Sequence, residues 1–205
     1  MKKIEHYKSV FHLTSTNNFE NILKLGLLSR SKLNKNFYDI ADKEIIELRK
    51  RYELDKYIPF HFFPKNPFDG RVQRNNPTQN FMFLALNKKF INKYLNNFYI
   101  IPSHPLHLYK INSLRIYNYN EGIHVLNWDL MNLRNFSNNE CKQACMSECI
   151  TDLNLNINDF NYIAVKDKNI KENLENKLRL YNREYGKNIN IYINIIPEWF
   201  INLYP

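Results

Sequence analysis

The stretch Lys142-Gln143-Ala144-Cys145-Met146-Ser147-Glu148-Cys149-Ile150 contains a change of period. Up to Ser147 the pattern is helical, and cysteines recur at every fourth position from 141 to 149. From Glu148 the side chains alternate with period two, which is typical of a strand. The sequence therefore predicts a helix that gives way to a strand, with the carboxylate of Glu148 held at the rigid start of that strand.

Further short elements are expected on both sides of this junction. Strands are predicted over residues 9–13, 81–86, 98–101, 148–153, 162–165 and 189–195, and residues 57–67 are expected to form a strand that turns into an extended loop. Helices are predicted over residues 17–27, 39–52, 88–96, 129–133, 137–147 and 170–185, and the polar residues 69–79 are expected to form a mobile loop. Strands and long helices do not alternate regularly, so an α+β fold in one domain, residues 1–205, is favoured over a doubly wound sheet.

The composition favours a folded protein that attracts anions. The chain has 205 residues, of which 44% are hydrophobic, and Lys plus Arg exceed Asp plus Glu by 29 to 20. That surplus attracts phosphate polymers by its long-range field, although a basic bias for solubility gives the same number. With 4 glycines, little room remains for a Gly-rich nucleotide loop.

The cysteines and histidines do not predict a metal site. Cys141, Cys145 and Cys149 are interpreted as small buried residues, because metal sites usually use tighter pairs and no histidine is near in sequence. His104 and His107 lie in one turn without further ligands at the usual spacing. No leader and no membrane-spanning apolar run is visible, so a cytoplasmic protein without a membrane partner is expected.

Several segments, taken in order, resemble the DarT family of DNA ADP-ribosyltransferase toxins. The matching motifs are Phe11-His12-Leu13-Thr14, Gly26-Leu27-Leu28, the helix from Ile40 to Arg51, Tyr57-Ile58-Pro59-Phe60-His61-Phe62 with Pro64-Lys65-Asn66-Pro67, Leu126-Asn127-Trp128 and Ser147-Glu148-Cys149-Ile150-Thr151. The resemblance spans nearly the whole chain. It differs at Lys65 and Asn66, where the family has arginine and serine, and at His61, where tyrosine is common.

The resemblance implies an ADP-ribosyltransferase-like fold with a split central sheet and NAD as co-substrate, without a metal. ADP-ribose would pass to a base in single-stranded DNA, with thymine the first expectation and guanine the second. A monomeric toxin of this kind would pair with an antitoxin that removes ADP-ribose, either a macrodomain protein or a NADAR-type hydrolase.

The resemblance also implies roles for particular residues. Glu148 would hold the nicotinamide ribose through its hydroxyl, stabilise the sugar cation and also take a proton from the attacking base nitrogen. Arg49 and His104 are further catalytic candidates, with His107 as second choice in that turn. The NAD-binding candidates are His12, Thr14, Arg49, Arg51, Tyr57 and Phe60, of which Arg49 or Arg51 would hold the pyrophosphate. Lys65, Arg71 and Arg74 would contact DNA phosphates.

Two other functions remain open at this stage. The same fold could modify RNA or protein instead of DNA. Alternatively, the chain could be a basic nucleic-acid-binding module without enzymatic activity, in which case Glu148 would have no effect on turnover.

Overall fold

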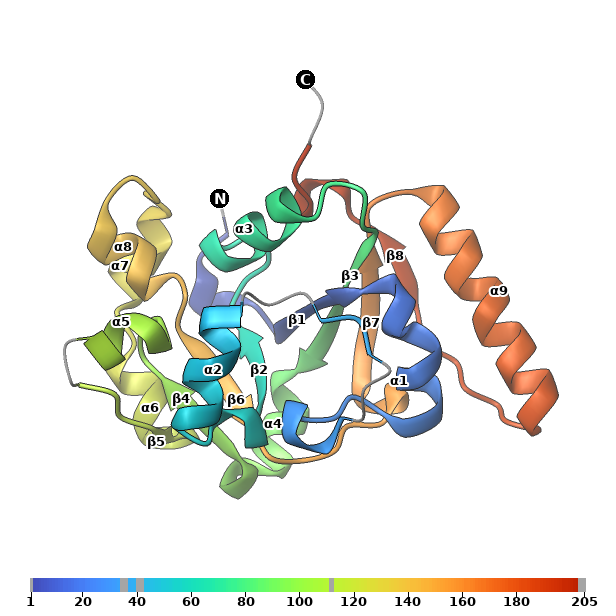
Figure 1. Cartoon of the computed structure of the whole chain (residues 1–205), viewed down its shortest axis with the longest axis horizontal. Coiled ribbons are helices and arrows are strands. Elements are labelled where there is room, and N and C mark those ends of the chain that lie inside the picture. The colour runs from blue at the N-terminus through green and yellow to red at the C-terminus, as the bar shows by residue number, and fades with distance from the viewer. Residues whose placement is uncertain (1, 34–36, 40–42, 111–112, 203–205) are drawn as a thin grey trace.

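The computed structural model describes residues 2–33, 37–39, 43–110 and 113–202 and places its strands in one mixed sheet (Figure 1). The strand order is β5-β4-β6-β2-β1-β3-β7-β8, and among the described strands only the β7–β8 pair is parallel. A mostly antiparallel sheet is incompatible with a doubly wound topology. The α+β prediction is therefore confirmed.

The elements are short and follow the change of period in the sequence. The strands are β1 (Ser9–Ser15), β2 (Ile58–His61), β3 (Phe81–Asn87), β4 (Phe98–Ile101), β5 (Tyr117–Asn118), β6 (Glu148–Thr151), β7 (Phe160–Val165) and β8 (Ile193–Ile195). The α-helices are α1 (Phe19–Leu25), α2 (Lys43–Arg51), α3 (Pro67–Asn75), α4 (Lys88–Lys93), α5 (Pro105–Lys110), α6 (Tyr119–Val125), α7 (Trp128–Leu133), α8 (Asn139–Ala144) and α9 (Lys168–Tyr185).

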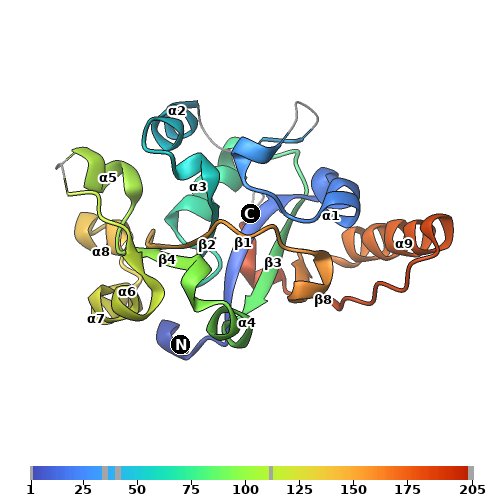
Figure 2. The same cartoon turned by 90° about the horizontal axis from the view of Figure 1, so that it is seen from below.

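Helices gather at both ends of the sheet. Figures 1 and 2 place α1 and α9 beside the β7–β8 end and α5 to α8 beside the β4–β5 end. Alternate residues of each central strand bury opposite faces: in β3, Leu84 joins the main core, while Phe83 packs with Val72 of α3 and Phe200. This alternation is the reason that period-two runs identified the strands.

Among the described strand pairs, β1 and β2 share the fewest paired residues. β1 pairs with β3 along its whole length, but in the described structure it pairs with β2 only where Phe11 lies opposite His61. Away from this point the strands diverge, and the imidazole of His12 reaches across to the carbonyl of Pro59. The predicted split of the central sheet corresponds to this divergence.

The predicted loop over residues 69–79 is wrong, because most of it is helix α3. The side chain of Asn66 accepts a hydrogen bond from the backbone N–H of Asp69 at 3.0 Å, and Pro67 occupies the first turn. Asn followed by Pro is a recognised start of a helix, since the amide caps an orphan N–H and proline already has a helical φ.

Smaller differences concern the ends of elements. Asn138 caps α8, which covers residues 139–144 of the predicted 137–147, and β8 covers only residues 193–195 of the predicted 189–195. The backbone of Ile189 instead bonds to the side chain of Asn182. The predicted helix over 39–52 is α2, and residues 40–42 lie outside the described residues. Gly186, which directly follows the predicted helix over 170–185, ends α9 with φ of 58°.

The prediction that the three cysteines are buried is confirmed. Cys141, Cys145 and Cys149 are buried and unpaired by disulfides. In the described part of the chain no group of three or more potential ligands could hold a metal ion, and no described helix is both long and apolar enough to cross a membrane.

Candidate functional site

A cavity, termed the first cavity, opens where β1 and β2 diverge. Its polar lining includes His12 and Thr14 from β1, His61 from β2, Glu148 from β6 and Arg49 from α2, together with Asn18, Arg30, Asp39, Tyr57 and His104. The lining residues are far apart in sequence, and the fold brings them together around one cavity, which the diverging strands leave open.

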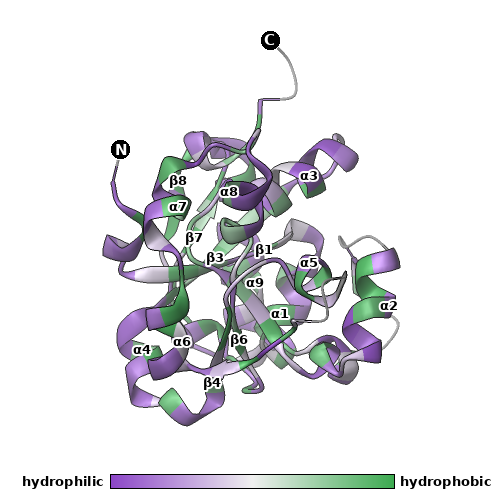
Figure 3. Cartoon of the chain, turned by 90° about the vertical axis from the view of Figure 1, so that its left-hand side faces the viewer, coloured by the Kyte–Doolittle hydropathy of each residue, from purple (hydrophilic) through white to green (hydrophobic). Residues whose placement is uncertain are grey.

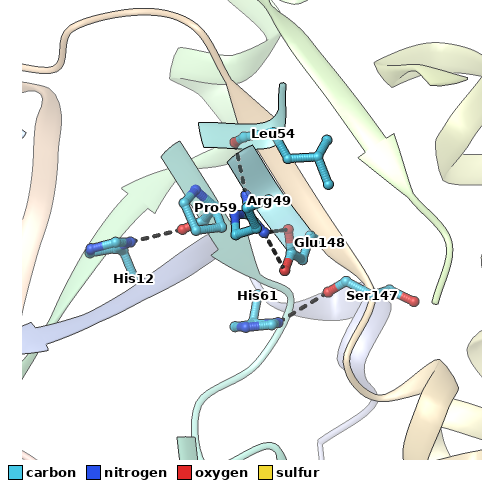
Figure 4. A network of polar contacts seen from close by, with 7 residues as sticks. All are labelled: His12, Arg49, Leu54, Pro59, His61, Ser147 and Glu148. Atoms are coloured by element: carbon cyan, nitrogen blue, oxygen red, sulfur yellow. Dashed lines mark hydrogen bonds and ion pairs between the residues drawn. The ribbon is translucent and has the colours of Figure 1, made fainter. Parts of the chain in front are cut away.

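Glu148 and Arg49 form a buried ion pair in the first cavity (Figure 4). One guanidinium nitrogen of Arg49, Nη1, lies 3.0 Å from Oε1 and 2.8 Å from Oε2 of Glu148, and Nη2 donates to the carbonyl of Leu54 at 3.3 Å. Because Glu148 begins β6 and Arg49 lies in the last turn of α2, both charges are fixed by regular structure. This arrangement presents a pre-oriented carboxylate in a site shielded from water.

The histidines of the first cavity have lowered pKa values. Burial lowers the pKa of His12 and of His104 to about 4, and it also lowers the pKa of His61. Nδ1 of His12 lies 2.8 Å from the Pro59 carbonyl, and Nδ1 of His61 lies 3.2 Å from the Ser147 carbonyl. A carbonyl only accepts, so each Nδ1 carries the hydrogen and each Nε2 carries a lone pair.

Asn18 organises the opposite wall. Its side-chain amide accepts from the backbone N–H of Tyr38 at 2.7 Å and donates to the carbonyl of Tyr38 at 2.9 Å and to Oγ1 of Thr14 at 3.1 Å. Next to Tyr38, Asp39 forms an ion pair with Arg30. The segment 37–39 is thus fixed over β1 by side-chain contacts.

A second cavity lies beside the first and shares Ile45, Phe68, His104 and Leu106 with it. Cations line it from two helices and the residues before them: Lys65, Arg71 and Arg74 near α3, and Lys142 on α8, with Phe136, Gln143 and His107 nearby. None of the described residues that line it is acidic. Figure 3 shows that α3 and α8 are largely hydrophilic. Such a surface suits an anionic chain with aromatic groups.

The structure brings most of the predicted site residues to these two cavities. Arg51 does not reach either one: it is exposed, and its guanidinium lies 3.4 Å from the hydroxyl of Tyr109. Phe60 is also outside, because its ring is completely buried in the main core and packs against the ring of His12. His107 lines only the second cavity, whereas His104 lines both.

Several polar residues of the cavities were not among the predicted site residues, and His61, Asn18 and Lys142 are three of them. His61 lies directly opposite Glu148 in the β2–β6 register, Asn18 anchors the segment 37–39, and Lys142 precedes the carboxylate by six positions. Only His61 had a signal in the sequence, because it departs from the family pattern. The other two depend on contacts between distant segments.

The sequence and the fold of the chain are similar to those of known proteins. The family model described as "ssDNA thymidine ADP-ribosyltransferase, DarT" matches residues 11–201. Thermus sp. 2.9 DarT in complex with ADP-ribosylated ssDNA has a TM-score of 0.80 at 18% identity, over 95% of this chain and 96% of that chain. The same DarT in complex with NAD+ has a TM-score of 0.75 at 16% identity, over 96% of this chain and 98% of that chain.

A longer chain also shares the fold. Thermosipho africanus DarTG in complex with ADP-ribose has a TM-score of 0.70 at 17% identity, over 95% of this chain and 51% of that chain. No curated protein sequence matches this chain.

Proposed function

The chain belongs to the DarT family, and we propose on this premise that its first cavity binds NAD and transfers ADP-ribose to thymine in single-stranded DNA. Family membership makes it an NAD-dependent enzyme that ADP-ribosylates single-stranded DNA. The observation that carries the assignment to this cavity is the buried Arg49–Glu148 pair, held between the split strands.

The reaction places its charge beside Glu148. The bond between C1′ of the ribose and the nicotinamide nitrogen breaks, and its electron pair leaves with nicotinamide. Positive charge then grows on the ribose, where an oriented anion in a dry site stabilises it most effectively. A ring nitrogen of the base forms the new bond to C1′ and loses its proton.

Arg49 supports this chemistry through Glu148. Nη1 of Arg49 donates to both carboxylate oxygens, so we assign it the orientation of the carboxylate in place of the pyrophosphate contact expected from sequence. His12 and Thr14 line the β1 wall and are proposed to contact the ribose. Tyr57 forms part of the wall, and His104 stands where the first cavity meets the second.

The second cavity is the proposed path for the DNA strand. Lys65, Arg71 and Arg74 would contact phosphates, and Lys142 adds a cation from α8. Phe68 and Phe136 offer rings on which bases can stack. Because the cavities share His104 and Phe68, a base extruded from this path can enter the first cavity.

The partner of the enzyme follows from its chemistry. Modified DNA blocks replication, so we propose that the chain acts as a monomeric cytoplasmic toxin beside an antitoxin that removes ADP-ribose. A macrodomain or a NADAR-type hydrolase has that activity.

Mass spectrometry of short oligonucleotides tests the proposal. Each oligonucleotide carries one base type at its centre and is incubated with protein and NAD, beside RNA and protein pools. We expect one ADP-ribose on the thymine oligonucleotide and none with Glu148→Gln. Labelling confined to RNA or protein, or DNA binding without NAD consumption, would contradict the proposal and favour another acceptor or a binding module.

A further inference from the structure

We infer that His61 takes the proton from the ring nitrogen of the target base when that nitrogen bonds to the ribose. This inference rests on the proposed function, and it concerns a residue for which the sequence predicted no role. His61 lies beside Glu148 with its ring held in one orientation, while both oxygens of Glu148 accept hydrogen bonds from Arg49.

His61 is placed next to the reacting centre by the sheet. It lies opposite Glu148 in the antiparallel β2–β6 pair, so both side chains leave the sheet on the same face. Directly opposite residues have Cβ atoms roughly 5 Å apart. His61 is buried and lines the first cavity.

The ring of His61 is held in one orientation (Figure 4). Nδ1 donates to the carbonyl of Ser147 at 3.2 Å, and the ring packs on Phe68 with centroids 5.3 Å apart. In the described part of the chain Nε2 has no hydrogen-bond partner. A base that is oriented through its other nitrogen and retains a lone pair is the arrangement used for proton transfer in catalysis.

Glu148 is less suited to receive this proton. Both of its oxygens accept hydrogen bonds from Arg49. Protonation of the carboxylate would leave the buried guanidinium without a counter-charge, which is strongly unfavourable for a buried pair. A proton on His61 leaves that pair intact.

The charge balance favours the same assignment. The nicotinamide ring of NAD is cationic before reaction, and after the bond breaks the charge passes to the ribose. The base then forms its bond to C1′, its N–H bond breaks, and the proton moves to Nε2 of His61. The positive charge therefore stays beside the Glu148 carboxylate throughout.

The charged and titratable groups around His61 come from four segments. Burial has the largest effect on the pKa of His61 and lowers it, whereas Glu148 of β6 raises it and Arg49 of α2 lowers it. His12 of β1 and His104 before α5 line the same cavity. His104 also lies near Glu148, but no hydrogen bond from its ring to a described residue fixes its orientation.

A matched pair of variants tests the inference. His61→Asn can keep the bond to the Ser147 carbonyl but has no atom at the place of Nε2. His61→Gln puts an amide at that place, and an amide cannot take the proton. Single-turnover rates are measured on oligonucleotides with one central deoxyuridine or 5-fluorodeoxyuridine, whose ring N–H is more acidic. We expect both variants to lose about 10²–10³-fold on deoxyuridine and much less on the fluorinated base.

The controls separate this inference from the proposed function. If the wild type modifies neither oligonucleotide nor thymine, the proposed function fails. If the wild type is active and His61→Asn retains its rate, or if both variants lose equally on the two bases while NAD binding is retained, the inference is overturned. Variants that lose NAD binding or thermal stability are judged by the ratio of rates on the two bases, which a folding defect leaves at the wild-type value.

Discussion

The two cavities differ in how they hold charge. In the first cavity, Arg49 pairs with Glu148 and Arg30 pairs with Asp39, and the pKa values of the histidines are lowered by burial. In the second, Lys65, Arg71, Arg74 and Lys142 line a surface without a described acidic residue. Fixed, paired charges act on one atom at short range, whereas a row of exposed cations acts through a field that salt screens.

Among the variants that test the difference between the two cavities, replacement of Glu148 is expected to lower turnover the most. Glu148→Gln keeps the shape but removes the charge, so turnover of NAD and DNA should fall at least about 10³-fold while NAD binding changes little. Single-turnover rates measure the loss of turnover, and NAD titration measures the affinity for NAD. Asp152→Asn, which removes an exposed carboxylate just beyond β6, is the matched control and should keep wild-type activity. Equal activity of Glu148→Gln and wild type would remove the distinction between the cavities.

The two arginines of α2 give the next test. Arg49→Ala should lower turnover by about 10²-fold and destabilise the fold by about 3–5 kcal/mol, because Glu148 is left buried without its partner. Arg51→Ala, on the exposed side of the same helix, should leave turnover within about twofold and stability within about 0.5 kcal/mol. Urea unfolding and single-turnover rates separate the variants, and a larger loss for Arg51→Ala would reverse the assignment.

The histidines of the first cavity predict a dependence of stability on pH. Their usual pKa is 6.5, and in the fold the pKa of His12 and of His104 is about 4, so between these values the unfolded chain binds protons that the folded chain does not. Stability should therefore fall as the pH drops through this range, by about 1 kcal/mol per histidine near pH 5.5.

Urea unfolding at several pH values measures this loss. His104→Gln removes the titration of His104 and should flatten the curve. An unchanged slope in that variant would show that His104 does not titrate in the way its burial indicates.

The second cavity predicts the smallest effect for each residue. Arg74→Ala should weaken binding of single-stranded DNA severalfold and reduce the salt slope of log K by about 0.7. Arg179→Ala on α9 removes an equal charge outside both cavities and serves as control. Affinity measured at several salt concentrations would contradict the proposed path if the two variants behave alike.

Predictions succeeded where the sequence signal was local and clear, and failed where it was ambiguous or depended on packing. The start of β6 at Glu148 was predictable because the period changes there. α3 was missed because the cap signal of Asn66 and Pro67 stands before a polar, Arg-containing stretch that resembles a loop. Phe60 was assigned to the NAD site from its motif, although its place in the alternation of β2 turns it into the core.

The sequence by itself determined the α+β class, the strand that begins at Glu148, and the family, since period and motif order are local properties of the chain. Only the tertiary structure decided that Arg49 and not Arg51 meets Glu148, and that His61 stands across from it. These contacts join segments that are separated by up to 99 positions along the chain. A side chain can be assigned to such a contact only after strand register and helix rotation are fixed.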